Sequence, residues 1–136
     1  MNREILFRGK RIDNGEWAEG SLIKVTLGGK TVYLIFGNDF TFDGTDVKAL
    51  DHALVDPETV GEYTGLNANG KKIFEGDIVQ AHFRTNHTVQ KYEVTMADGM
   101  FLFDNRYVEV PRYDIYDLKV IGNIHDNSEL LEGVEA

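Results

Sequence analysis

The chain has 136 residues and a formal net charge of −9, with 14 Lys and Arg against 23 Asp and Glu. It contains no cysteine, which excludes disulfides, thiolate metal sites and cysteine nucleophiles. Hydrophobic residues make up 42% of the chain, so a core can form, and the length suits one domain or two very small subdomains. The acidity is spread over both halves and would repel phosphate backbones, which argues against general nucleic-acid binding.

The N-terminus has no apolar run of signal-peptide length, and no stretch approaches the roughly 20 apolar residues of a membrane span. Small secreted domains often depend on disulfides, so the absence of cysteine favours a reducing compartment. We therefore expect a soluble protein of the cytoplasm that does not bind membranes.

The first part of the chain predicts a three-stranded β-meander, because apolar and polar residues alternate with the period of a strand. Turn signals separate the strands at Asp13-Asn14-Gly15 and at Gly28-Gly29. The predicted strands cover residues 4–8, 16–27 and 31–36.

The middle of the chain is rich in loop-forming residues between 37 and 56. Residues 46–54 suit either a loop or a short helix capped by Asp46. A short strand is predicted at 58–63. The GLNANG segment at 65–70 then reads as a turn-rich connector, and we place a subdomain boundary between residues 66 and 67.

The second half predicts five short strands joined by tight turns, which is typical of a small antiparallel barrel. Glu75-Gly76-Asp77 and Asp98-Gly99 supply two of the turns. In the last strand, alternate residues from Tyr116 to Ile124 are expected to share one face. A terminal helical turn is predicted at 127–132, with Ser128 as its cap. The strands are predicted at 78–83, 89–97, 100–103, 107–110 and 116–124.

Four sequence blocks stand in series along the chain: REILFRGK at 3–10 with GEW at 15–17, DPETVGEYTGL at 56–66, NGKKIFEGDIV at 69–79, and VIGNIHDN at 120–127. Together they resemble the YopX family of phage and prophage proteins. The resemblance runs nearly from end to end, with looser agreement at 28–52 and 84–112.

This resemblance implies a phage or prophage origin, and hence the cytoplasm of a bacterial host. It also implies a mainly β fold with little helix, whose C-terminal part is similar to an SH3-type barrel. The predicted organisation is an N-terminal β-meander subdomain at 1–66, including an acidic loop region, and an SH3-like barrel at 67–136; one integrated domain is the alternative. The resemblance implies no activity and no site residues.

No pattern for catalysis or cofactor binding occurs in the chain. Gly28-Gly29-Lys30-Thr31 ends like a phosphate-binding loop, but it lacks the first glycine and lies within a hairpin. The four histidines, at 52, 82, 87 and 125, have no zinc-site spacing. We predict no catalytic residue, no metal and no cofactor.

The leading functional hypothesis is a non-enzymatic accessory or protein-binding module, with a host or phage protein as partner and self-association left open. One alternative is nucleic-acid binding by a basic and aromatic barrel face, although acidic residues interleave with it. A second alternative is a metal-dependent enzyme using the acidic loop at 39–58. The candidate binding residues are Trp17, Tyr92, Arg106, Tyr107, Arg112 and Tyr113.

Overall fold

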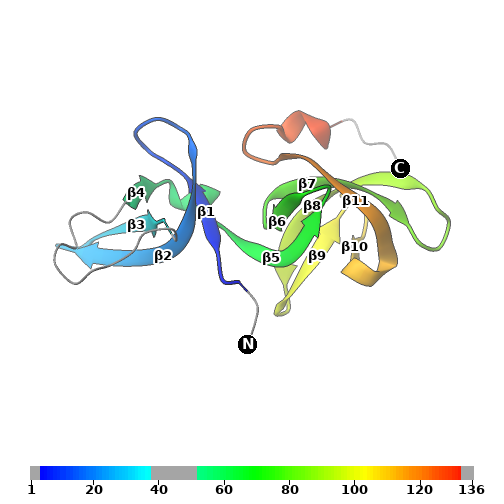
Figure 1. Ribbon diagram of the computed structural model, residues 1–136, viewed down its shortest axis with the longest axis horizontal. Coiled ribbons are helices and arrows are strands. Elements are labelled where there is room, and N and C mark those ends of the chain that lie inside the picture. The colour runs from blue at the N-terminus through cyan, green and yellow to red at the C-terminus, as the bar shows by residue number, and fades with distance from the viewer. Residues whose placement is uncertain (1–3, 38–51, 133–136) are drawn as a thin grey trace. The chain divides into compact units, whose positions relative to one another are not determined.

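A computed structural model describes residues 4–37 and 52–132, which form two antiparallel β-sheets (Figure 1). The mainly β fold predicted from the sequence is confirmed. The chain divides into two compact units, Met1–Tyr63 and Thr64–Ala136. Strand β5 (Gly61–Ala68) begins in the first unit beside β1 and continues in the second unit beside β6, and the boundary predicted after residue 66 falls within it. No helix among the described residues is long and apolar enough to cross a membrane.

The first unit contains the predicted three-stranded meander as β1, β2 and β3, and a fourth strand, β4, pairs with β3 to give the order β4-β3-β2-β1. Its hairpins turn as the sequence indicates, because Gly15, Gly28 and Gly29 supply positive φ angles of 72°, 56° and 79°. The first strand begins later than predicted, at Phe7, since its antiparallel pairing with β2 starts at the Phe7–Gly20 pair. The strands are β1 (Phe7–Lys10), β2 (Trp17–Leu27), β3 (Lys30–Phe36) and β4 (His52–Val55).

The short helix considered for residues 46–54 is wrong for the described residues of that range, because they belong to strand β4. Within that range the described residues, His52 to Leu54, are strand, and residues 46–51 lie outside the described part of the chain. Burial alternates along β4, with Ala53 and Val55 in the core, which is the period of a strand. Its outer edge is joined to the end of β1 and the residues after it, because Ile12 N–H donates to Leu54 O at 2.9 Å and Asp56 N–H donates to Lys10 O at 2.9 Å.

The core of the first unit lies on one face of these strands and is built mostly from small and branched side chains. Ile35, Ala53 and Val55 are buried, with Leu22 and Tyr33 among the side chains packed against them.

A 3-10 turn, Pro57–Thr59, replaces the start of the strand predicted at 58–63. Asp56 caps it by accepting the Glu58 N–H at 3.0 Å, and proline suits the first turn because it has no N–H to satisfy. Residues 65–68, predicted as connector, belong to β5, and the turn to β6 (Lys71–Phe74) is only Asn69-Gly70.

The second unit contains a five-stranded sheet in the order β10-β9-β8-β7-β11. The predicted strands are confirmed, although β10 is shorter than the predicted run at 107–110. In this order β10 and β11 are the two edge strands, so the closed SH3-like barrel remains a prediction. The strands are β7 (Asp77–Phe83), β8 (Val89–Ala97), β9 (Met100–Asp104), β10 (Glu109–Val110) and β11 (Ile115–Asn123).

The last strand departs from the alternation expected from Tyr116 to Ile124. Its register with β7 shifts between Tyr116 and Lys119, where Asp117 has a positive φ of 56°. The bulge changes which parity faces inward, so Ile115 and Leu118 are both buried. The terminal 3-10 turn, Ser128–Leu130, follows Asn127, so the prediction of Ser128 as the cap is wrong.

Candidate functional site

The six candidate residues do not form one site. Tyr92 is wrong as a binding residue, because it is 1% exposed and lies in the core of the second unit. Burial also raises the pKa of its hydroxyl. Tyr92 lies two residues before buried Val94 in β8, so both side chains are on the same face of the strand and face the core.

Trp17 is half-buried at the start of β2 and contacts two cations of its own unit. The guanidinium carbon of Arg8 lies 4.7 Å from the ring centroid and the ammonium of Lys10 lies 5.7 Å from it. These distances are within the range of cation–π attraction. The ring also lines a surface pocket of about 200 Å³ with Ile35 and Ala53. The basic cluster at 8–11 therefore packs partly against Trp17.

Arg106 and Tyr107 lie in the loop between β9 and β10. Arg106 Nη1 lies 3.0 Å from Glu93 Oε1, so this cation already has an ion-pair partner. Buried Asn105 holds the loop, since its Oδ1 accepts the Tyr107 and Val108 N–H groups at 2.9 Å each. Tyr107 itself is exposed.

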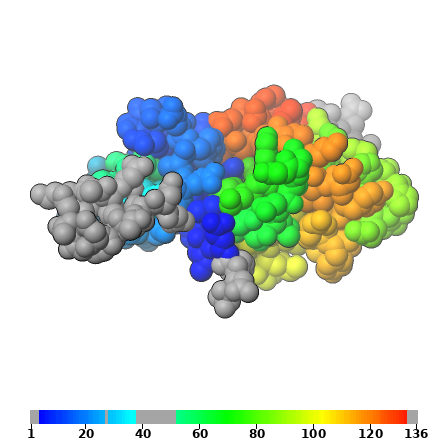
Figure 2. Space-filling view, viewed as in Figure 1, coloured from blue at the N-terminus to red at the C-terminus, as the bar shows by residue number. Residues whose placement is uncertain are grey.

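Arg112 and Tyr113 form part of the 3-10 turn Arg112–Asp114. This turn packs beside β9 and β11. Figure 2 shows the β7–β8 segment and β11 side by side in yellow-green and orange. We call the resulting group the Tyr116 cluster; it consists of His82, Arg84, His87, Arg112, Tyr113 and Tyr116.

The Tyr116 ring is surrounded by side chains from β7 and the turn after it. His82 stacks on it with ring centroids 5.0 Å apart and 22° between the planes. The Arg84 guanidinium lies 5.4 Å from the ring centroid. The Tyr116 hydroxyl and His87 Nδ1 are hydrogen-bonded at 2.8 Å. The ring is thus held in a fixed position.

Two guanidinium groups meet at one carbonyl oxygen in this cluster. Arg112 Nη1 donates to Ile115 O at 2.8 Å, and Arg84 Nη2 donates to the same oxygen at 3.4 Å. Arg84 Nε also donates to Tyr113 O at 2.9 Å, across 29 residues of sequence. The nearest acidic groups in the sequence are Asp114 and Asp117, and Asp117 Oδ2 lies 3.7 Å from His82 Nδ1.

A second surface, in the first unit, is aliphatic. Ile23 pairs with Leu34, and Leu34 pairs with Leu54, so their side chains lie on the same side of the sheet. Ile12 extends the row, because its N–H bonds to Leu54 O. Ile12, Ile23 and Leu54 are 60%, 44% and 42% exposed. We call these four residues the aliphatic row.

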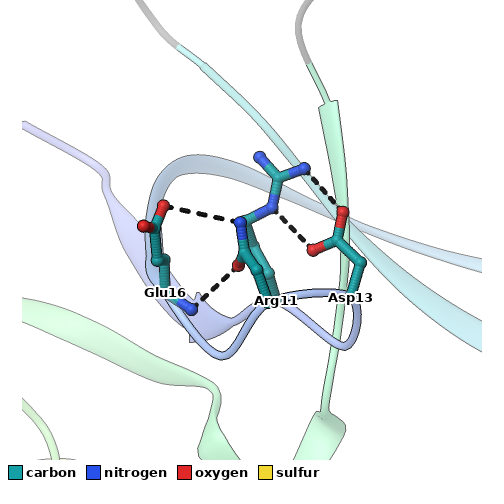
Figure 3. A network of polar contacts seen from close by, with 4 residues as sticks. Arg11, Asp13 and Glu16 are labelled. Carbon is teal, nitrogen blue, oxygen red and sulfur yellow. Dashed lines mark hydrogen bonds and ion pairs between the residues drawn. The ribbon is translucent and has the colours of Figure 1, made fainter.

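One end of the aliphatic row is bordered by a fixed ion pair. Arg11 donates to both carboxylate oxygens of Asp13, at 3.0 and 2.9 Å (Figure 3). The hydrogen bond from Arg11 lowers the pKa of the Asp13 carboxyl. The backbone of Arg11 also donates to Glu16 O at 2.8 Å, which closes the turn. A surface pocket of about 400 Å³ lies here, lined partly by Ile12, Leu34 and Leu54.

The residues of the acidic-loop alternative fall mainly outside the described part of the chain. Asp56 is described, and it caps the 3-10 turn. Within residues 4–37 and 52–132, no three His, Asp or Glu side chains come together in a way that could hold a metal ion. The acidic residues of this loop that are not described are Asp39, Asp43, Asp46 and Asp51.

Comparison with known proteins identifies relatives across nearly the whole chain. The family model described as YopX protein matches residues 6–132. The crystal structure of protein EF1440 from Enterococcus faecalis is 26% identical, with a TM-score of 0.59 over 96% of this chain and 100% of that chain. That of protein yopX from Bacillus subtilis is 20% identical, with a TM-score of 0.47 over 96% of this chain and 98% of that chain. No curated protein matches the chain.

Proposed function

This chain belongs to the YopX family, and from that premise we propose that it is a non-enzymatic accessory protein of a phage or prophage that acts by binding a protein partner. The site of action in this proposal is the cytoplasm of the bacterial host. The partner is a host protein, a phage protein or a second copy of the chain.

The aliphatic row is the observation that carries the proposal. Four branched aliphatic side chains from four separate segments lie together, and three of them keep more than two-fifths of their surface exposed. Single exposed aliphatic residues are ordinary, but contiguous ones bordered by polar groups are characteristic of protein interfaces. Such a row offers nothing to a phosphate or a metal ion, so its chemistry favours a protein surface as ligand.

The three polar residues that are buried as a whole in the described part of the chain support a binding function over catalysis. Asp77 accepts the Phe74 N–H at 2.8 Å, Asn105 holds its own loop, and Thr59 joins two segments of the first unit. Each of these groups is used to hold the backbone in place. They account for all the polar and charged residues that are buried in the described part of the chain.

The proposal includes an SH3-like small barrel for the second unit. Its strand order supports this, because β7 pairs with β8 on one side and with β11 on the other. A 3-10 turn also leads from β10 into β11, so the last strand returns to the first strand of the sheet.

The nucleic-acid alternative receives less support from the same residues. Tyr92 is in the core and Arg106 is paired with Glu93, so the predicted basic and aromatic face loses two of its members. The net charge of −9 also opposes binding to a polyanion.

The test compares variants of the purified, tagged chain as bait in a lysate of host cells carrying the phage. The variant Ile23→Lys/Leu54→Lys places charges on the aliphatic row. Val89→Lys is the matched control, because Val89 is an exposed aliphatic residue of the second unit. Circular dichroism and light scattering verify the fold and the oligomeric state.

We expect a partner that binds the wild-type chain and the Val89→Lys control but not the double variant. A dimer that only the double variant loses would identify the partner as a second copy. If the double variant captures the same proteins as the wild type, or if the wild type captures none and is a monomer, the proposal is wrong.

A further inference from the structure

The Tyr116 cluster holds two positive charges close together on a strongly acidic protein. Arg84 and Arg112 donate to the same carbonyl oxygen of Ile115, so their guanidinium groups are near neighbours. Like charges at such separations repel one another, and an anion between them would relieve the repulsion. We propose that this cluster binds an oxyanion, a carboxylate or phosphate, presented by an acidic peptide segment.

The donors needed for this ligand are present in the cluster. A guanidinium has donors on all three of its nitrogens, and Arg84 uses Nε and Nη2 while Arg112 uses Nη1. Among the described residues, neither arginine has a carboxylate partner. The remaining nitrogens, Nη1 of Arg84 and Nε and Nη2 of Arg112, are therefore available to an oxyanion, which guanidinium groups bind with paired hydrogen bonds.

The cluster is also held in position before a ligand arrives. Arg84 is fixed by two backbone carbonyl oxygens and by the Tyr116 ring, and that ring is in turn fixed by His82 and His87. Less side-chain freedom is lost on binding when the contacting groups are already ordered.

Tyr113 favours a peptide as the carrier of the oxyanion. Tyr113 is 73% exposed, while its carbonyl oxygen accepts from Arg84, so its aromatic surface lies close to the two cations. A peptide with an acidic residue next to an aromatic residue matches both features. A nucleic acid would bring further phosphates towards Asp114, Asp117 and the acidic remainder of the molecule.

This inference does not depend on the aliphatic row, since the two surfaces belong to different units. Nuclear magnetic resonance titration of the full-length, isotope-labelled chain tests it directly. The probe is the peptide acetyl-Gly-Asp-Phe-Glu-Gly-amide. The comparison ligands are its neutral counterpart with Asn and Gln, inorganic phosphate, and a short oligothymidylate.

We expect saturable shifts at the backbone amides of Arg84, Tyr113 and Ile115 with the acidic peptide. Arg112→Gln and Tyr113→Ala should each weaken binding, the first by about tenfold or more, because a charge-assisted hydrogen bond is lost. Tyr113→Ala leaves the carbonyl acceptor of Arg84 in place, so it separates loss of the ring from loss of the fold. Arg106→Gln is the control, because Arg106 is paired with Glu93 in the same unit.

Several outcomes would overturn the inference. They are an absence of saturable shifts at these amides, equal binding of the neutral peptide, and equal weakening by Arg106→Gln. If inorganic phosphate binds as tightly as the peptide, the proposal that a peptide presents the oxyanion is wrong. Tighter binding of the oligothymidylate, lost in Arg112→Gln, would assign the cluster to nucleic acid instead.

Discussion

Single residues in the first unit connect segments that are far apart in the chain. The buried hydroxyl of Thr59 donates to Asp56 O at 2.6 Å and accepts the Lys10 N–H at 2.8 Å, across 49 residues. At Gly20, in contrast, the structure requires that no side chain be present. A Cβ at that position would lie 1.8 Å from Phe36 O in the neighbouring strand, so only glycine fits without a shift of the backbone.

Replacing Thr59 by Val tests the value of this hydroxyl. The change keeps the shape of the side chain but leaves the Lys10 N–H without its acceptor, so we expect unfolding in urea to show a loss of about 1–3 kcal/mol. Thr59→Ser, which keeps the hydroxyl, should lose less. Equal stability of the Val variant and the wild type would show that water replaces the hydroxyl.

At the scale of elements, irregular segments position the polar groups of the second unit. The bulge at Asp117 sets its carboxylate near His82, and the loop between β9 and β10 sets Arg106 against Glu93. Burial raises the pKa of the Glu93 carboxyl, and Arg106 opposes this increase. The charged form of Glu93 is therefore disfavoured in the folded protein relative to the unfolded chain.

This shift predicts how stability depends on pH. Because the folded pKa of Glu93 lies above its ordinary value of 4.5, the stability it contributes is full below that value and is lost as the pH rises through the folded pKa. Between acidic and neutral pH, the wild type should therefore lose more stability than Glu93→Gln, measured by urea unfolding at each pH.

Arg106→Gln provides a check in the other direction. Removing the cation raises the Glu93 pKa further, so this variant should lose more stability than the wild type over the same pH range. Superimposable pH profiles for all three proteins would contradict the assignment of this pH dependence to Glu93.

At the scale of the whole molecule, the net charge of −9 dominates long-range interactions. We expect no saturable binding of duplex DNA at roughly 150 mM salt, where the Debye length is about 8 Å and any local cationic attraction is screened. Fluorescence anisotropy with a labelled duplex measures this. Tight binding that weakens steeply with salt would instead favour the nucleic-acid alternative.

Sequence alone determined the features that depend on neighbouring residues. Asp13–Gly15, Gly28-Gly29 and Asp98-Gly99 form the predicted turns, because glycine and its polar neighbours tolerate positive φ. Alternation of apolar and polar residues likewise predicted most of the strands. The four sequence blocks predicted the YopX family, which the family comparison confirmed.

Tertiary structure decided what depends on pairing between distant segments. His52 to Leu54 form a strand because β3 pairs with them, and the Asp117 bulge arises where β11 meets β7. The aliphatic row and the Tyr116 cluster exist only because register places side chains from separate segments side by side. Register is set by long-range hydrogen bonding and burial, and a one-residue shift moves each side chain to the other face. Local sequence patterns therefore predicted only Arg112 and Tyr113 of the Tyr116 cluster, and none of the aliphatic row.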